Sequence, residues 1–180
     1  DLTIYEQAQG FQMMLDLGES VKDISEKTGF SETTVRRRIK LLELDQEKLK
    51  ESVLRGATIM DYAELEKIEN IELRNKVLEE IGTSNFKWAL KRAIDQEKAE
   101  KDMALLLEHL DSFAIKVDSN SGLRYIRTYY PSDHEKFQKP DDVGTTKYFY
   151  TVSKSNYSYV TLYAEASETE EDEEAKKQQE

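Results

Sequence analysis

Cysteine is absent from this chain of 180 residues, which excludes disulfide bonds, a thiolate-ligated zinc site and a cysteine nucleophile. No apolar run approaches the roughly 18 residues that a membrane-spanning helix needs. The first residues, DLTIYEQAQ, lack the basic and apolar regions of a signal peptide. We therefore expect a cytoplasmic protein with no membrane association. Because the chain opens on Asp1 rather than Met, we also expect a fragment whose N-terminal part is missing.

Positive charge is in short supply, with 26 basic residues against 37 acidic ones and a formal net charge of -11. Residues 165–180, EASETEEDEEAKKQQE, hold eight of the acids and two of the bases. We expect a disordered acidic tail here, because the segment has almost nothing to bury. The alternative is a tail that competes with DNA or recruits a basic partner. Exposed charges further apart than about 8 Å are screened at physiological salt, so a basic helix elsewhere can still bind phosphate.

Glycine and proline are also few, seven and two, and the first 110 residues show helical periodicity. A first helix is predicted from Thr3, which forms a capping box with Glu6, to about Gly18. Further capping residues predict four more short helices, and another short helix is predicted to end before Gly82. Ser84 is expected to cap a long helix with apolar ends and a polar middle. The expected ranges are 20–27, 31–42, 45–55, 58–68 and 72–81 for the short helices and 85–110 for the long one.

Residues 113–164 switch to short β-rich runs separated by turns. The runs 113–118 and 123–130 predict one hairpin, and the runs 146–153 and 157–164 predict a second. Eight of the ten tyrosines lie between residues 125 and 163. They either form a stacking platform for single-stranded nucleic acid or, as we favour, pack against the long helix or a second subunit.

The most informative stretch is SVKDISEKTGFSETTVRRRIKLLEL, residues 20–44. Gly29 tolerates the positive φ that a sharp turn between two short helices favours, and Ser31 restarts the chain as the cap of the second helix. At about 100° per residue, the second helix separates its apolar side chains from its polar ones. Val35, Ile39 and Leu42 of the second helix are expected to form the inner face together with Ile24 of the first. The expected outer face of the second helix is Thr33, Arg36, Arg37 and Lys40.

A short, polar and cationic outer face is typical of a DNA recognition helix, since guanidinium groups bind guanine or phosphate and a helix N-terminus binds phosphate. Glu32 lies close to the expected DNA surface, where it either accepts from a cytosine amino group or repels phosphate. Arg38 lies at the flank, where packing or an ion pair explains it as well as a DNA contact does. Three consecutive arginines alone indicate only a solvated face, but the turn, the caps and the two faces agree. The predicted DNA-binding residues are Ser31, Glu32, Thr33, Arg36, Arg37 and Lys40.

These segments resemble the central DNA-binding domain of ParB-like partition proteins, a family that includes chromosome-segregation and nucleoid-occlusion factors. The opening DLTIYEQA is similar to the family's DLNPIEEA segment, and GFSETTVRRRIKLLEL follows its pattern G-x-S-x-x-x-V-x-x-x-L-R-L-L-x-L. LKESVLRGATIMDYAELEKI is similar to the family segment in which a helix ends at glycine and a small-residue stretch opens the next. The resemblance covers residues 1 to about 94.

The resemblance implies sequence-specific binding of double-stranded DNA, in plasmid, phage or chromosome partition or in associated transcriptional regulation. It also implies a partition ATPase as a partner, and we expect a homodimer. In the family a CTP-binding domain with arginine-rich nucleotide motifs precedes the DLNPIEEA segment. Those motifs are absent here, so no cofactor is expected for this chain.

The expected fold class is mainly α with a small α+β C-terminal part. Its domains are a multi-helical helix-turn-helix DNA-binding domain (1–84), a long connecting helix (85–110), a Tyr-rich antiparallel sheet as a candidate dimerisation region (111–164) and the acidic tail (165–180).

Catalysis is not expected, because the usual phosphate-binding loop patterns are missing. His109 and His134 are the only histidines and have no metal-ligand spacing. A metal held by His134 with Asp133 and Glu135 is less favoured than a solvated loop. The alternative function is a protein-interaction or assembly module, in which the helix-turn-helix and the Tyr-rich sheet bind a protein partner.

Overall fold

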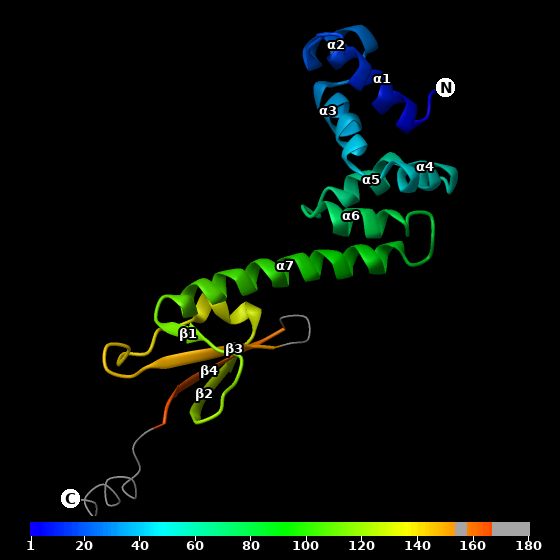
Figure 1. The fold of residues 1–180 in the computed structure, drawn as a ribbon. Helices are drawn as coiled ribbons and strands as arrows, with labels where there is room; N and C mark the ends of the chain where they lie inside the picture. The colour runs from blue at the N-terminus through cyan, green and yellow to red at the C-terminus, as the bar shows by residue number, and fades with distance from the viewer. Residues whose placement is uncertain (154–157, 167–180) are drawn as a thin grey trace, which may run out of the picture. The chain divides into compact units, whose positions relative to one another are not determined.

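The computed structural model describes residues 1–153 and 158–166 of the chain. The chain packs as two compact units, unit 1 (1–97) and unit 2 (98–180), and the boundary falls inside the long helix α7 (Phe86–Asp111). Unit 1 is built from helices, and unit 2 contains a small four-stranded sheet (Figure 1). The chain is therefore mainly α with a small α+β part, as predicted. No described helix is both long and apolar enough to cross a membrane.

The first two helices begin at capping boxes. α1 (Ile4–Asp16) follows Thr3, whose hydroxyl accepts from the Glu6 N–H at 3.2 Å while the Glu6 carboxylate accepts from the Thr3 N–H at 2.8 Å. α2 (Val21–Thr28) follows Ser20, which exchanges the same two bonds with Asp23. Such pairs satisfy N–H groups that have no partner within the helix. The predicted starts of both helices are confirmed.

The next helices of unit 1 also start at side-chain caps. Ser31, Asp45, Thr58 and Asn70 each accept a hydrogen bond from a backbone N–H in the turn that follows. The third helix ends two residues earlier than predicted, where a 3-10 turn begins. The elements are α3 (Glu32–Lys40), η1 (Leu41–Glu43), α4 (Gln46–Leu54), α5 (Ile59–Leu65) and α6 (Ile71–Leu78).

Helix α7 contributes one end to each unit. Leu90 and Ala93 lie in the main core of unit 1, whereas Met103, Leu106 and Leu110 lie in the core of unit 2. The two predicted apolar ends are thus confirmed. Trp88, near the start of α7, is 64% exposed, and the Arg92 guanidinium carbon lies 5.1 Å from its ring centroid.

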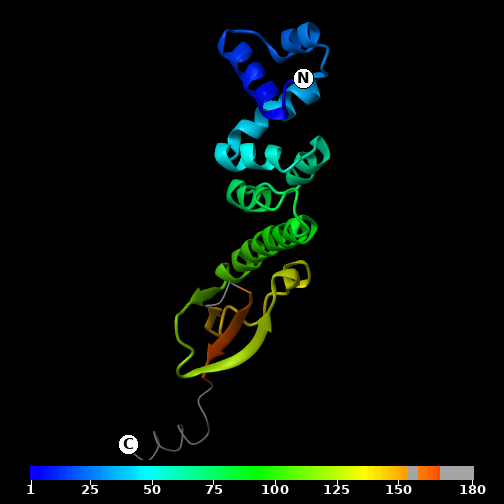
Figure 2. The same ribbon diagram turned by 90° about the vertical axis from the view of Figure 1, so that its right-hand side faces the viewer.

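The sheet of unit 2 is mixed rather than antiparallel, which corrects the prediction. Its strands are β1 (Ala114–Lys116), β2 (Leu123–Tyr129), β3 (Tyr148–Val152) and β4 (Val160–Glu165), and their order across the sheet is β1-β3-β4-β2. Figure 1 labels the four strands, and Figure 2 shows the same sheet turned by 90°. β3 pairs antiparallel with β4, so the second predicted hairpin is confirmed. Its predicted turn, residues 154–156, lies outside the described residues.

The first predicted hairpin is wrong, because β1 pairs in parallel with β3 while β2 pairs antiparallel with β4. β1 and β2 are the two edge strands, and residues 117–122 join one edge to the other. The physical reason is burial. β4 carries Val160, Leu162 and Ala164, all fully buried, and β3 carries the buried Tyr148 and Tyr150. These two strands hold most of the apolar surface and therefore occupy the centre of the sheet.

Tyrosine packing against the long helix, the favoured interpretation, is confirmed for part of the set. Tyr129, Tyr148 and Tyr150 lie in the same core as the C-terminal end of α7. The Tyr150 hydroxyl also donates a short hydrogen bond to the Asp111 carboxylate at the end of α7. Burial of the ring, and then that bond, raise the Tyr150 pKa. Tyr125 in contrast is 59% exposed.

One boundary in unit 2 and the surroundings of His134 also differ from the prediction. Glu165, placed in the acidic tail, is the last residue of β4 and pairs with Leu123. The rest of the predicted tail, from 167 on, lies outside the described residues. The segment 131–136 forms the short helix η2 (Pro131–Lys136), and its His134 is not in a solvated loop. Its Nε2 lies 3.2 Å from an Asp102 carboxylate oxygen on α7, and its side chain is only 15% exposed.

Candidate nucleic-acid interface

A tight turn at Gly29 joins α2 to α3. Gly29 has φ of 78°, the left-handed conformation that glycine adopts without strain, and it ends α2. The Ser25 hydroxyl donates to the Phe30 carbonyl at 2.6 Å, which holds the two sides of the turn together. Ser31 then caps α3, because its hydroxyl accepts from the Thr34 N–H at 3.2 Å. The predicted turn at Gly29 and the predicted cap at Ser31 are therefore present.

The inner face of α3 is fixed by a small apolar cluster. Phe11 of α1, Ile24 of α2 and Val35 of α3 form its buried centre, and Ile24 and Val35 are fully buried. Ile39 packs against this cluster and is partly buried, as the helical spacing predicts. The cluster determines which face of α3 points outward, since rotating the helix would expose these side chains to water.

Arg38, left open between packing and DNA contact by its sequence, is a packing residue. It is only 5% exposed, and its Nε donates to the Gln7 side-chain oxygen on α1 at 3.1 Å. Desolvation by burial lowers the pKa of Arg38 from its ordinary value. Two of the three consecutive arginines, Arg36 and Arg37, remain for the outer face.

The outer face of α3 presents the four residues predicted for it. Thr33, Arg36, Arg37 and Lys40 are all exposed, and the capping residue Ser31 and its neighbour Glu32 lie exposed at the start of the helix. Five of the six predicted site residues therefore lie on α3, and the sixth, Ser31, is its cap. Among the described residues, Lys40 has no ion-pair or hydrogen-bond partner.

Both exposed arginines are already paired with carboxylates. Arg36 Nη2 lies 3.0 Å from Glu32 Oε2, one helical turn earlier. Arg37 Nε lies 3.5 Å from Glu66 Oε2, just beyond the end of α5. Each pair has more than a third of both side chains exposed, so each is weak and readily exchanged for another anion. Glu32 therefore has a partner that neither sequence interpretation gave it.

Glu66 is a residue that sequence reasoning missed. The helical spacing of residues 32 and 36 indicates that pair directly, but no local pattern connects residue 37 to residue 66. The contact arises because the chain folds back after α4, which brings the end of α5 beside α3. Only the tertiary structure reveals it.

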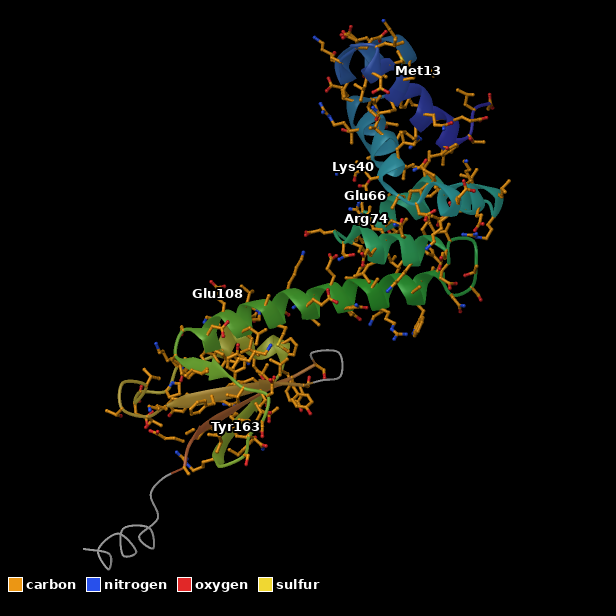
Figure 3. All side chains as sticks on the ribbon, in the orientation of Figure 1. Met13, Lys40, Glu66, Arg74, Glu108 and Tyr163 are labelled. Carbon is orange, nitrogen blue, oxygen red and sulfur yellow. The ribbon has the colours of Figure 1, made fainter. Side chains whose placement is uncertain are left out.

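A small groove begins at the C-terminal end of α3 and continues over α5 and α6. Its floor is apolar, formed by Leu41, Leu44, Tyr62 and Leu65, all of them buried. Its rim is charged, and Figure 3 shows three of the rim residues, Lys40, Glu66 and Arg74, one after another on the same side of unit 1. The rim consists of Arg37, Lys40, Glu66 and Arg74.

Comparison of the chain with protein-family models, curated proteins and solved structures gives no match. The resemblance to ParB-like partition proteins therefore stays a prediction. Across residues 1–153 and 158–166, no three His, Asp or Glu side chains are grouped so that they could hold a metal ion.

Proposed function

We propose that α2 and α3 form a helix-turn-helix that binds double-stranded DNA sequence-specifically, in a ParB-like protein of plasmid, phage or chromosome partition or of associated transcriptional regulation. The observation that carries the proposal is the outer face of α3. It places two arginines, a lysine and a threonine on one exposed side, opposite a buried apolar side. The arrangement suits a helix that enters the major groove with its N-terminal end.

Each outer residue has a role in this proposal. Thr33 and Arg36 lie in the first part of α3, where a recognition helix approaches base edges, and Arg36 is suited to bidentate contact with guanine. Ser31 and the first N–H groups of α3 face a backbone phosphate. Arg37 and Lys40, further along, lie where the helix leaves the groove. Glu32 orients Arg36 through their 3.0 Å ion pair before DNA arrives.

The buried cluster supports this division of roles. A recognition helix must be held at a fixed angle, because base contacts depend on the direction of short side chains. The packing of Val35 on Ile24 and Phe11, and the bond from Arg38 to Gln7, hold α3 against two other helices. We propose a homodimer, so that two such helices meet two half-sites.

The second candidate is a protein-interaction module, favoured by the carboxylates that already pair with Arg36 and Arg37. Glu32 and Glu66 reduce the positive charge of the outer face, and so weaken its attraction for phosphate. This function predicts a stable complex with a protein and negligible DNA affinity even at low salt.

The test is selection of bound fragments from a random duplex library at about physiological salt, with the full chain. An Arg36→Ala, Arg37→Ala double variant is selected in parallel. Arg92→Ala serves as the matched control, since Arg92 is exposed and belongs to the same unit but lies on α7. We expect the wild type and the control to enrich the same palindrome and the double variant to lose it.

The loss reflects about 1–3 kcal/mol for each arginine that reads a base. The half-site spacing of the palindrome reports the geometry of the dimer. Retention of an unchanged palindrome by the double variant would contradict the assignment of the site. Absence of any retained duplex would instead favour the protein-interaction module.

A further inference from the structure

The groove beside α3 has a cationic rim that extends beyond the predicted DNA surface. Arg74 comes from α6 and lies outside the six predicted site residues. With Arg37 and Lys40 it places three cations around the groove, against one carboxylate, Glu66. The local charge is positive in a chain whose net charge is -11.

The rim cations are positioned to accept an anion. Arg74 Nε donates to the Ile68 carbonyl, which fixes its guanidinium at the rim, and no described residue accepts from its Nη groups. Lys40 is exposed and unpaired among the described residues. Fixed donors that need no rearrangement bind an anion at less entropic cost than mobile ones.

The apolar floor strengthens this electrostatic arrangement. Leu65 is 2% exposed and Tyr62 is 4% exposed, so the floor below the cations is packed protein rather than water. Charge interactions beside such a surface are less screened than those over open solvent. A leucine floor also suits the carbon framework of a deoxyribose attached to the anion.

We propose that this groove binds one backbone phosphate of the DNA that α3 reads, through Lys40, Arg74 and Arg37. The inference rests on the proposed function and extends its contact surface from α3 to α6. It divides the arginines into two kinds. Arg36 reads bases, whereas Arg37 belongs to the groove that sets the register of the protein on the duplex.

Glu66 occupies the place of the phosphate in the free protein. Its carboxylate oxygen lies 3.5 Å from Arg37 Nε, beyond the 2.7–2.9 Å of a short charge-assisted bond. A phosphate offers more oxygens and more charge, so it displaces this loose contact. Glu66 thereby weakens binding to any phosphate, whatever the base sequence.

The test measures the affinity of the full chain for the selected duplex and for an unrelated duplex at several salt concentrations. Lys40→Ala and Arg74→Gln are each expected to reduce the slope of log affinity against log salt by about one. Each variant lowers the affinity for both duplexes by the same factor, and Glu66→Gln raises the affinity for both by about three-fold at low salt. Lys76→Ala is the matched control, because Lys76 is an exposed lysine of α6 outside the groove.

Thermal unfolding of each variant separates binding from folding. Lys40→Ala removes no hydrogen bond between described residues, so its result stands even if Arg74→Gln is destabilised. The groove proposal would be overturned if Lys40→Ala and a folded Arg74→Gln both kept the wild-type salt slope. If the Arg36→Ala, Arg37→Ala variant still lost its sequence preference, the proposed function would stand. A wild-type chain that binds neither duplex at low salt would overturn both.

Discussion

Unit 1 and unit 2 differ in how far apart in sequence the residues that specify their structure lie. In unit 1 each of the helices α1 to α6 begins at a capping side chain that lies next to it in sequence, such as Thr3 or Ser20. In unit 2 the partner of a strand lies far along the chain, since β1 pairs with β3 rather than with the adjacent β2. Local chemistry therefore specifies the elements of unit 1, whereas burial of surface that is distant in sequence specifies the order of strands in unit 2.

The largest predicted effect tests whether the two cores are separate. Leu162 is fully buried in β4, so Leu162→Ala should destabilise unit 2 by about 2–5 kcal/mol. Urea unfolding can follow both units, because the single tryptophan, Trp88, lies in unit 1 and eight of the ten tyrosines lie in unit 2. We expect the tyrosine circular dichroism transition to shift and the tryptophan fluorescence transition to stay within experimental error.

The matched variant for this test is Leu78→Ala, because Leu78 is fully buried in the core of unit 1. It should give the opposite pattern, with the tryptophan transition shifted. Equal shifts of both transitions in either variant would show that the two units unfold as one cooperative structure, and would contradict the prediction of separate cores.

A second prediction contrasts two glycines of unit 1 that both adopt positive φ. A Cβ on Gly82 would lie 2.9 Å from the Cβ and the carbonyl oxygen of Arg55, whereas a Cβ on Gly29 meets nothing within 4 Å. We expect Gly82→Ala to cost about 2–4 kcal/mol and Gly29→Ala about 1 kcal/mol, which is the backbone strain alone. Thermal unfolding followed by Trp88 fluorescence measures both, and equal costs would mean that Arg55 moves away freely.

A smaller effect is predicted at a polar contact in the core of unit 1. Ser52 donates to the Leu49 carbonyl at 2.6 Å, so the 2.7 Å bond between Ser52 and Tyr62 uses the Tyr62 hydroxyl as donor. Tyr62→Phe removes that buried bond and should cost about 0.5–1.5 kcal/mol in urea unfolding. Tyr159→Phe, at an exposed ring of unit 2, is the control and should leave stability unchanged.

The smallest predicted effect is an acid dependence confined to unit 2. The bond from Lys98, and then the proximity of His134, lower the pKa of Asp102 below its ordinary value of 3.8. A carboxylate with a lowered folded-state pKa stabilises the protein above its unfolded-state pKa, and that stability is lost as pH falls through the folded-state pKa. Asp102→Asn should therefore flatten the decline of the tyrosine transition below about pH 4, with little change in the tryptophan transition.

Sequence reasoning predicted most of the helical structure because its signals lie within one turn of the feature they specify. The cap at Ser31, the turn at Gly29 and the inward position of Val35 all follow from neighbouring residues. The same reasoning placed all six candidate DNA-binding residues on α3 and its cap. It left Arg38 undecided, because burial against Gln7 depends on how α1 crosses α3.

What could not be predicted is what depends on contacts between distant segments. An alternating pattern indicates which side chains of a strand share a face, but it does not name the neighbouring strand. The pattern therefore detected β1 and β2 and gave them the wrong partners. Glu66 and Arg74 were missed for the same reason, since they reach the end of α3 only after α5 and α6 have packed beside it.

The parallel pairing of β1 with β3 also has a consequence for folding kinetics. β1 cannot complete its ladder until residues 117–147 have emerged and β3 has formed, so the pairing requires closure of a long loop. Native contacts of high sequence separation slow folding, whereas the short-range contacts of α1, α2 and α3 form early. During synthesis, unit 1 can therefore reach its native state while β1 of unit 2 is still unpaired.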